Sequence, residues 1–447
     1  MSKTMAETTE LPFYLRGNFA PIMNEATAFD LPCDGAIPPE LRGVYVRNGP
    51  NAKGGDPGHW FTGDGMLHGV RLEHGKAAWF RNRWVRTRAF AEGAELVDAN
   101  GNVDHSVAVA NTNIIGHAGR LFALVESSWP TEVTRELDTI GPCDFGGRLT
   151  TSMTAHPKLD PVSGELHFFG YRFLPPFLTY HRLDTAGALV QSEVIDVPGP
   201  TMIHDFAITE DHVIFMDLPI VFNFERAMSR QGFPYEWSDD CGARLGVMPH
   251  GGGNADVRWF EITPCYVFHP LNAFDNDHGI VLDVVRYDSL WRGGPDTFTP
   301  AFLHRWTIDL AAGAVGEQRL DDRPIEFPRV DDRRTGRCHR YGYAVTNVAN
   351  VGEQSMHLVK YDLATGAATA HDFGPGCTPA EGVFVPAGAR AGEDDGWVLL
   401  YVYDAGRDTS DLVILDAARF AAPPVASIRL PQRVPFGFHG NWIADAP

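Results

Sequence analysis

Short apolar segments, rather than long helical repeats, dominate the pattern of hydrophobic and polar positions along the chain. "HVIFMDLPIVF" (residues 212–222), "GIVLDVVRYD" (279–288) and "GWVLLYVYD" (396–404) are rich in β-branched and aromatic residues. Gly, Pro or Asp residues bound these segments, as expected for strands that end in turns. Helical patterns are limited to two short candidates, residues 223–230 and a segment near Asp416. The pattern therefore predicts an all-β fold.

A degenerate hairpin motif recurs along the chain. "HRLDTAGAL", "RWTIDLAAGAV" and "KYDLATGAAT" place Asp184, Asp309 and Asp362 before a short loop that contains Gly. Asp opens such a turn, and Gly supplies the positive φ that it needs. The spacing fits a repeat of roughly 60 residues, the size of a four-stranded propeller blade, and the chain has room for about seven. We therefore predict one β-propeller domain over residues 1–447, with a two-sheet sandwich as the alternative.

The amino-acid composition limits the kinds of molecule that the protein can bind. The 447 residues include 37 Lys and Arg against 57 Asp and Glu, a formal net charge of −20, which would repel nucleic acid. Six widely spaced cysteines without a Cys-x-x-Cys pair predict reduced thiols in a cytoplasmic protein. The sequence shows neither a secretory signal nor an apolar run long enough to span a membrane. At most we expect peripheral contact with a membrane, and no obligatory protein partner.

Four histidines share a local context. They are His156 in "TAHPKL", His204 in "MIHDFA", His269 in "VFHPLN" and His439 in "GFHGNW". Each follows an apolar or small residue, at a point where we expect a strand to end. The inner strands of propeller blades converge on one axis, so these imidazoles can meet and form a transition-metal site. The alternative for each is a hydrogen-bonded core histidine. His439 lies near the chain end, which fits a propeller that closes its ring with strands from both termini.

Ordered blocks over nearly the whole chain resemble the carotenoid cleavage oxygenases, a family that includes lignostilbene dioxygenases. They include "GNFAPI" (17–22), "RNGPN" (47–51), "HWFTGDGMLHGV" (59–70), "MIHDFAIT" (202–209) and "RVPFGFHGNW" (433–442). The resemblance implies a seven-bladed β-propeller capped by a dome of loops and short helices. It also implies one ferrous ion on the propeller axis as the cofactor.

The resemblance also assigns site residues. The implied Fe(II) ligands are His156, His204, His269 and His439. Glu126 in "LVESSWP", Glu326 in "EFPRV" and Glu381 in "AEGVFVP" match glutamates that accept hydrogen bonds from the ligand imidazoles. Such a carboxylate fixes the tautomer and aims the other ring nitrogen at the metal. Thr112 in "ANTNI" matches a threonine near an open iron position, with an ordinary strand threonine as the alternative.

The implied activity is oxidative cleavage of a C=C bond in a conjugated apolar alkene by O2, which gives two carbonyl products. The candidates for an apolar substrate tunnel, all beside matched motifs, are Trp60, Phe61, Phe268 and Phe438. The stilbene and alkenylphenol branch has a Lys directly before the first glutamate, where it binds the substrate phenol, and here that position is Val125. Without this cation we favour an apocarotenoid over a stilbene or an alkenylphenol.

Three further classes remain as alternatives: a propeller metal hydrolase, which would favour calcium and oxygen ligands, a propeller scaffold without chemistry, and an isomerase or inactive relative. A separate hypothesis concerns "FGYRFLPPFLTYH" (169–181), whose Phe173, Leu174 and Phe177 are candidates for contact with a membrane. Buried packing is the alternative for these three side chains.

Overall fold

The computed structural model describes residues 11–229, 232–295, 297–350 and 355–445. Within them the α-helices are α1 (Arg88–Glu92) and α2 (Phe224–Ser229), so the helix expected within residues 223–230 is confirmed. The helix expected near Asp416 is wrong. The Asp416 side chain accepts the amides of Ala418 and Arg419, which bends the chain into a turn instead.

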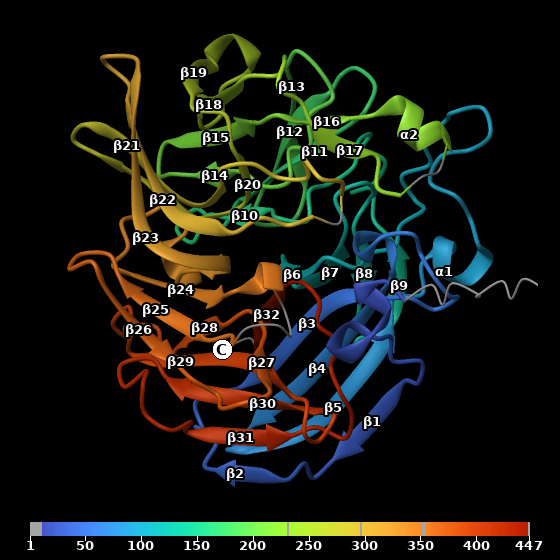
Figure 1. Cartoon of the computed structure of the whole chain (residues 1–447), viewed down its shortest axis with the longest axis vertical. Coiled ribbons are helices and arrows are strands. Elements are labelled where there is room, and N and C mark those ends of the chain that lie inside the picture. Colours follow the sequence, from blue (N-terminus) through green and yellow to red (C-terminus); the bar gives the residue numbers. More distant parts are fainter. Residues whose placement is uncertain (1–10, 230–231, 296, 351–354, 446–447) are drawn as a thin grey trace, which may run out of the picture.

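Antiparallel sheets form the first four blades of a β-propeller (Figure 1). The first pairs β1 (Ala26–Phe29), β5 (Lys76–Trp84), β4 (Asp64–Glu73), β3 (Gly43–Asn51) and β32 (Gly440–Ala444). The second contains β6 (Asn113–His117), β7 (Arg120–Leu124), β8 (Thr131–Val133) and β9 (Thr139–Pro142). The third contains β10 (Lys158–Leu159), β11 (Leu166–Tyr171), β12 (Leu178–Leu183) and β13 (Leu189–Ile195). The fourth contains β14 (Ala207–Ile208), β15 (His212–Asp217), β18 (Ala243–Pro249) and β19 (Arg258–Ile262), and β16 (Ile220–Phe222) pairs separately with β17 (Tyr235–Trp237).

The fifth and sixth blades share one long strand. Their strands are β20 (Tyr266–Asn276), β21 (Gly279–Tyr287), β22 (Ala301–Asp309), β23 (Ala314–Arg329), β24 (Tyr341–Thr346), β25 (Leu358–Asp362) and β26 (Ala367–His371). Residues 314–324 of β23 pair with β22, and residues 325–329 pair with β24. The seventh blade contains β27 (Cys377–Pro379), β28 (Val383–Pro386), β29 (Gly396–Asp404), β30 (Thr409–Asp416), β31 (Ala426–Arg429) and β2 (Cys33–Gly35). The described residues therefore confirm the all-β fold and the seven blades.

Strands from both ends of the chain close the ring. In Figure 1, β32 lies beside β3, and the two pair from Gly43 with Ala444 to Arg47 with Gly440. The first and seventh blades then pack through buried aromatic side chains, with the rings of Tyr45 and Tyr401 5.0 Å apart. This closure explains why the segment around His439 belongs to the core.

The predicted hairpin turns are also present. Asp184, Asp309 and Asp362 each accept amide hydrogens from the loop that follows them. The glycines after them adopt positive φ, for example 78° at Gly187 and 73° at Gly366. Three hairpins of the propeller therefore form for the local reasons that the sequence gives.

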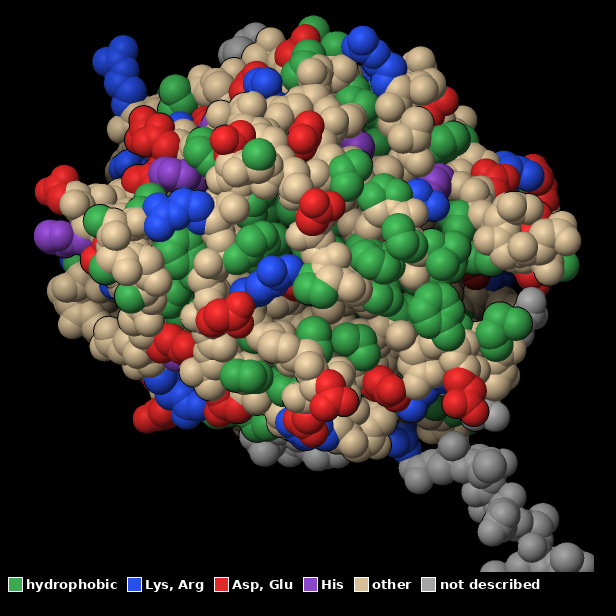
Figure 2. All heavy atoms as spheres, turned by 90° about the horizontal axis from the view of Figure 1, so that it is seen from above, with side chains coloured by type: hydrophobic (Ala, Val, Ile, Leu, Met, Phe, Trp, Pro, Cys, Tyr) green, Lys and Arg blue, Asp and Glu red, His purple; other side chains and the backbone are tan. Residues whose placement is uncertain are grey.

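Loops and short helices surround a cavity on one side of the propeller, and α1 and α2 contribute residues to its lining. This arrangement agrees with the expected dome. Figure 2 shows a face of the molecule on which hydrophobic side chains gather between charged ones. Among the described residues, we find no helix with the length and hydropathy needed to cross a membrane.

Candidate metal centre and substrate cavity

Three of the four histidines lie just before an inner strand, and the fourth lies within one. His439 directly precedes β32, and His156 and His204 lie a few residues before β10 and β14. His269 lies within β20, at a register shift between Val267 and Pro270. The expectation that they stand at strand ends is therefore wrong. Loops that enter the inner strands meet at the axis as closely as the strand ends do, so the expected convergence does not depend on this detail.

The four imidazole rings form one buried cluster. The ring centroid of His156 lies 4.5 Å from that of His204, 5.0 Å from that of His269 and 4.6 Å from that of His439. The Nε2 atoms of His156 and His204 are 3.0 Å apart. His269 Nε2 is buried and has no hydrogen-bond partner among the described residues. Buried nitrogens that converge without other partners fit a transition metal, for which imidazole is a common ligand.

Each of three histidines has a carboxylate at Nδ1. The donor–acceptor pairs are His204 to Glu126 at 2.7 Å, His269 to Glu326 at 2.7 Å, and His439 to Glu381 at 2.9 Å. A carboxylate that accepts the Nδ1 proton leaves the Nε2 lone pair free for the centre of the cluster. The structure thus brings together every histidine and glutamate that the resemblance singles out, while their role in binding iron stays a prediction.

The pKa shifts differ between the histidine–glutamate pairs. Burial lowers the pKa of His439 to about 4, although Glu381 opposes this shift, so the imidazole is neutral at pH 7. Burial alone would raise the pKa of Glu381, but Arg329 and His439 outweigh it and lower that pKa to about 2. For His269, burial also acts to lower the pKa, but Glu326 outweighs burial and raises it. The pKa values of His269 and His439 are therefore shifted in opposite directions, although each imidazole donates to a glutamate.

Two residues outside the predicted set bind the glutamates through hydrogen bonds. Tyr287 Oη donates to Glu326 Oε1 at 3.0 Å, and Arg329 Nη1 donates to Glu381 Oε2 at 3.2 Å. Arg329 stands in the same "EFPRV" block as Glu326, which offered a signal. Tyr287 belongs to no motif, and only the packing of β21 against β23 brings it to the site.

His156 has a different environment from the other three. Its Nδ1 lies 3.8 Å from Asp205 Oδ2, and Lys158 Nζ lies 2.7 Å from the other oxygen of that carboxylate. Burial, together with the neighbouring histidines, lowers the pKa of His156 well below its ordinary value. Asp205 and Lys158 lie outside the predicted set, although each is within two residues of a candidate ligand.

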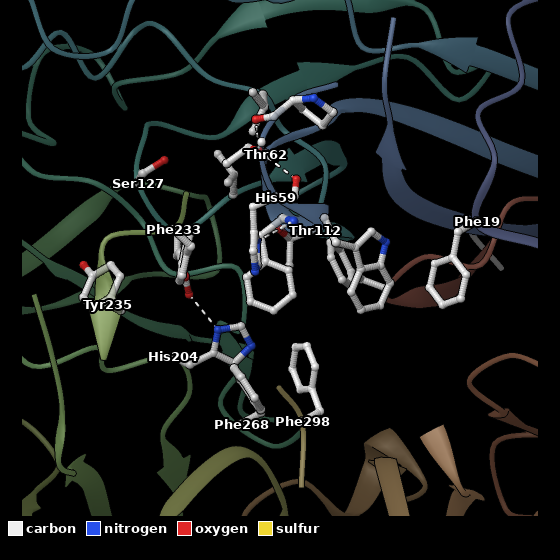
Figure 3. A pocket seen from close by; sticks show the side chains of 18 of the residues that line it. Phe19, His59, Thr62, Thr112, Ser127, His204, Phe233, Tyr235, Phe268 and Phe298 are labelled. Carbon is white, nitrogen blue, oxygen red and sulfur yellow. Dashed lines mark hydrogen bonds and ion pairs between the residues drawn. The ribbon is translucent and has the colours of Figure 1, made fainter. Parts of the chain in front are cut away.

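A cavity of about 1750 Å³ opens beside the cluster, and His204, His269 and His439 line it, whereas His156 does not. Figure 3 shows Phe233, Phe268 and Phe298 around His204 in this cavity. The predicted residues that line it are Trp60, Phe61, Thr112, Val125, Phe268 and Phe438. Their contact with a substrate stays a prediction. A mostly apolar lining of this size suits an elongated apolar ligand.

Aromatic residues of the dome loops extend this lining beyond the predicted set. Phe233 stacks on His59 with ring centroids 4.7 Å apart, and Phe298 lies 6.3 Å from Phe61. Neither residue has a sequence signal, because loop residues follow no periodic pattern. Thr112 Oγ1 donates to Asn111 Oδ1 at 2.9 Å, and the carbonyl oxygen of Thr112 accepts the His439 amide at 3.1 Å. Thr112 is therefore fixed beside one of the candidate ligands.

A propeller with a buried cluster of imidazoles beside a large, mostly apolar cavity fits the class of metal-dependent enzymes. The family described as retinal pigment epithelial membrane protein matches residues 19–444. A carotenoid cleavage oxygenase of Mycobacterium tuberculosis is 41% identical over 99% of each chain. Carotenoid 9,10(9',10')-cleavage dioxygenase 1 of Arabidopsis thaliana is 34% identical, over 97% of this chain and 90% of the relative.

Solved structures agree with these relatives. A lignostilbene dioxygenase of Pseudomonas brassicacearum is 33% identical with a TM-score of 0.87, over 98% of this chain and 100% of that one. A variant of the Synechocystis apocarotenoid oxygenase is 30% identical with a TM-score of 0.87, over 97% and 98% of the two chains. The chain belongs to the carotenoid cleavage oxygenase family, and it is an enzyme of the oxygenase class.

Proposed function

We propose that the protein is a non-haem Fe(II) oxygenase that cleaves one C=C bond of a conjugated apolar alkene with O2 and releases two carbonyl products. The observation that carries this proposal is the buried cluster of imidazoles beside an aromatic cavity. The residues that would hold the iron are His156, His204, His269 and His439. Bound Fe(II) would supply electrons that activate O2, which no side chain of the chain can do by itself.

The remaining residues bind, orient and exclude water. Glu126, Glu326 and Glu381 keep the Nδ1 protons of three imidazoles in place, so that each Nε2 would be free to bind the metal. The aromatic walls offer flat apolar faces to a polyene and keep water from the reacting bond. Thr112, held beside His439, would border the space next to a bound metal and limit what could approach it.

We favour an apocarotenoid as substrate, with a stilbene or an alkenylphenol as the alternative. Val125 lines the cavity next to Glu126, so a phenolate would meet an apolar side chain at that position rather than an ammonium group. A propeller metal hydrolase has less support, because the group of metal-ligating side chains within the described residues consists of histidines rather than oxygen donors.

The proposal is tested by product analysis. The enzyme is loaded anaerobically with Fe(II) and then mixed with O2 and a panel of apocarotenals, stilbenes and alkenylphenols. The masses of the products are measured by mass spectrometry. We expect a pair of carbonyl products from the apocarotenals, with masses that locate the cleaved bond. Carbonyl pairs from the stilbenes alone would overturn the substrate assignment. Iron-loaded enzyme that cleaves no member of the panel would contradict the proposed activity.

We also infer that the protein is cytoplasmic and that the loop at residues 172–177 touches a membrane peripherally. Leu174 in this loop is 44% exposed, and Met228 in α2 is 83% exposed. The ring of Phe173 stacks on that of Phe222 at 5.0 Å, which joins the loop to the segment before α2. Both segments line the cavity, so an apolar substrate could enter there directly from a bilayer.

Flotation with liposomes tests this contact. We expect the wild type to float with vesicles, and a variant with Phe173, Leu174 and Phe177 changed to Ser to stay in the aqueous fraction with an unchanged circular dichroism spectrum. A variant with Val162, Val190 and Val194 changed to Ser is a matched control, because these side chains are exposed elsewhere in the third blade. Wild-type protein that never floats would overturn the inference.

A further inference from the structure

We propose that the ion pair between the partly buried Lys158 and the buried Asp205 positions His156, and that it thereby sets the metal affinity of the imidazole cluster. This inference rests on the proposed function, because it assumes that the cluster binds a metal. His204, His269 and His439 each have a glutamate that accepts the Nδ1 proton. The pair formed by Lys158 and Asp205 occupies the corresponding place at His156.

The geometry identifies the outward nitrogen of His156. Its Nε2 faces Nε2 of His204 at 3.0 Å, which leaves Nδ1 on the side away from the cluster. Asp205 Oδ2 lies 3.8 Å from this Nδ1. That separation is too long for a hydrogen bond, so the carboxylate acts on the imidazole through its charge. The three glutamates, in contrast, make short hydrogen bonds of 2.7 to 2.9 Å.

The pair also connects the two chain segments that carry neighbouring candidate ligands. Lys158 begins β10, two residues after His156, and Asp205 directly follows His204 ahead of β14. Lys158 Nζ binds Asp205 Oδ1 at 2.7 Å, and that same oxygen accepts the Phe206 amide at 2.7 Å. The ion pair therefore joins the third blade to the fourth and constrains the separation of His156 and His204.

The energetics of the Lys158–Asp205 ion pair favour a role in positioning His156 over a role in stabilising the fold. The Asp205 side chain is 2% exposed and that of Lys158 is 20% exposed. Removing such charges from water costs about as much as their attraction returns, so a buried ion pair contributes little net stability. Loss of one partner is costly, however, because the other charge is left buried and unpaired. Loss of both partners should restore stability, but it should not restore the position of His156.

This contrast defines the experiment. The variants are Asp205→Asn, Lys158→Met and the double variant, each studied as the full chain with Co(II) as the probe metal. We measure the Co(II) dissociation constant, the visible absorption spectrum of bound Co(II), which reports ligand geometry, and the Tm of the metal-free protein. For Asp205→Asn we expect Co(II) to bind about 10- to 100-fold more weakly, as for other residues that orient metal ligands, with an altered spectrum. In the double variant we expect the Tm to recover toward the wild type while affinity and spectrum do not.

A second buried ion pair supplies the matched control. Asp160 is 4% exposed and lies 3.1 Å from Arg337, in the same blade as Lys158. Asp160→Asn and Arg337→Met should lower the Tm and leave Co(II) affinity within about twofold of the wild type, since they free no group next to the imidazoles.

Two results would overturn the inference. One is an Asp205→Asn variant that binds Co(II) with wild-type affinity and spectrum. The other is a double variant that recovers affinity together with Tm, because the pair would then act only through stability. Wild-type protein that binds neither Co(II) nor Fe(II) would overturn the proposed function itself, and this inference with it.

Discussion

The imidazole cluster has two unlike sides. His204, His269 and His439 line the cavity, and each donates to a glutamate through a short hydrogen bond. His156 does not line the cavity, and its outward nitrogen faces a carboxylate that Lys158 partly neutralises. On the cavity side, a separate hydrogen bond to a glutamate fixes the tautomer and the orientation of each ring. On the buried side, an ion pair fixes the backbone segments that carry two of the rings.

The largest effect should follow loss of a cavity-side ligand. His204→Ala removes one of four nitrogen donors and leaves Glu126 without its partner, so we expect metal content below one-tenth of the wild-type value. Cleavage should fall by at least about 1,000-fold, because the metal supplies the reactive chemistry. Metal content is measured by mass spectrometry after loading. His371→Ala is the control, since His371 is buried but contacts Phe420 outside the cluster. Wild-type metal content in the His204→Ala variant would contradict the proposed metal site.

A second effect appears as pH dependence of stability. The folded-state pKa of Glu381, about 2, lies below its ordinary value of 4.5. The carboxylate therefore stabilises the folded protein above about pH 4.5, by about 3 kcal/mol, and this stability is lost as the pH falls from 4.5 to 2. Urea unfolding of the metal-free wild type and of Glu381→Gln measures it. We expect the difference between the two to be large at pH 6 and to shrink toward pH 3; a difference independent of pH would contradict the assignment.

The hydrogen bonds to the glutamates should tune metal affinity by a smaller factor. In Glu326→Gln the neutral amide replaces the carboxylate that accepts the His269 Nδ1 proton, so we expect Co(II) to bind about 10- to 100-fold more weakly. Calorimetric titration measures the affinity. Glu317→Gln is the control, because Glu317 lies in β23 but accepts the amide of Thr263 far from the cluster. If wild type and Glu326→Gln bind Co(II) with equal affinity, the hydrogen bonds to the glutamates do not tune the metal site on the cavity side of the imidazole cluster.

The smallest effect should concern substrate choice. Val125→Lys places a cation next to Glu126 on the cavity side, where it can bind a phenolate. We expect the ratio of stilbene to apocarotenal cleavage to rise by about fivefold, a modest gain because the buried ammonium also pays a desolvation cost. Competition assays with mixed substrates measure the ratio. Val109→Lys, which changes another cavity residue, is the control and should not raise this ratio. A ratio that falls in Val125→Lys would contradict the proposed subsite.

Local patterns in the sequence predicted the fold well. The strand segments and the Asp–Gly turns at Asp184, Asp309 and Asp362 depend on neighbouring residues, and the structure confirms them. The helix expected near Asp416 failed because one side chain binding two backbone amides outweighs a weak helical pattern. Tyr287 was missed because it lies 39 residues from Glu326 in sequence and meets it only through the packing of strands.

The site was predictable only in part for the same reason. The shared context of the four histidines and the resemblance to a family selected the residues that converge, whereas the sequence could not show that His156, His204 and His439 precede the inner strands. Asp205 and Lys158 stood beside candidate ligands, but their contact joins two blades and no spacing rule predicts it. Contacts between distant segments require the three-dimensional fold.

X-ray absorption of the iron-loaded protein tests the central claim most directly. The fine structure at the iron edge reports the number and kind of ligand atoms, and imidazole rings give a characteristic outer-shell scattering pattern. We expect an inner shell dominated by nitrogen at about 2.0–2.2 Å, with the outer-shell signal of four imidazoles. An inner shell dominated by oxygen, with the outer-shell signal of two imidazoles or fewer, would contradict a four-histidine iron site.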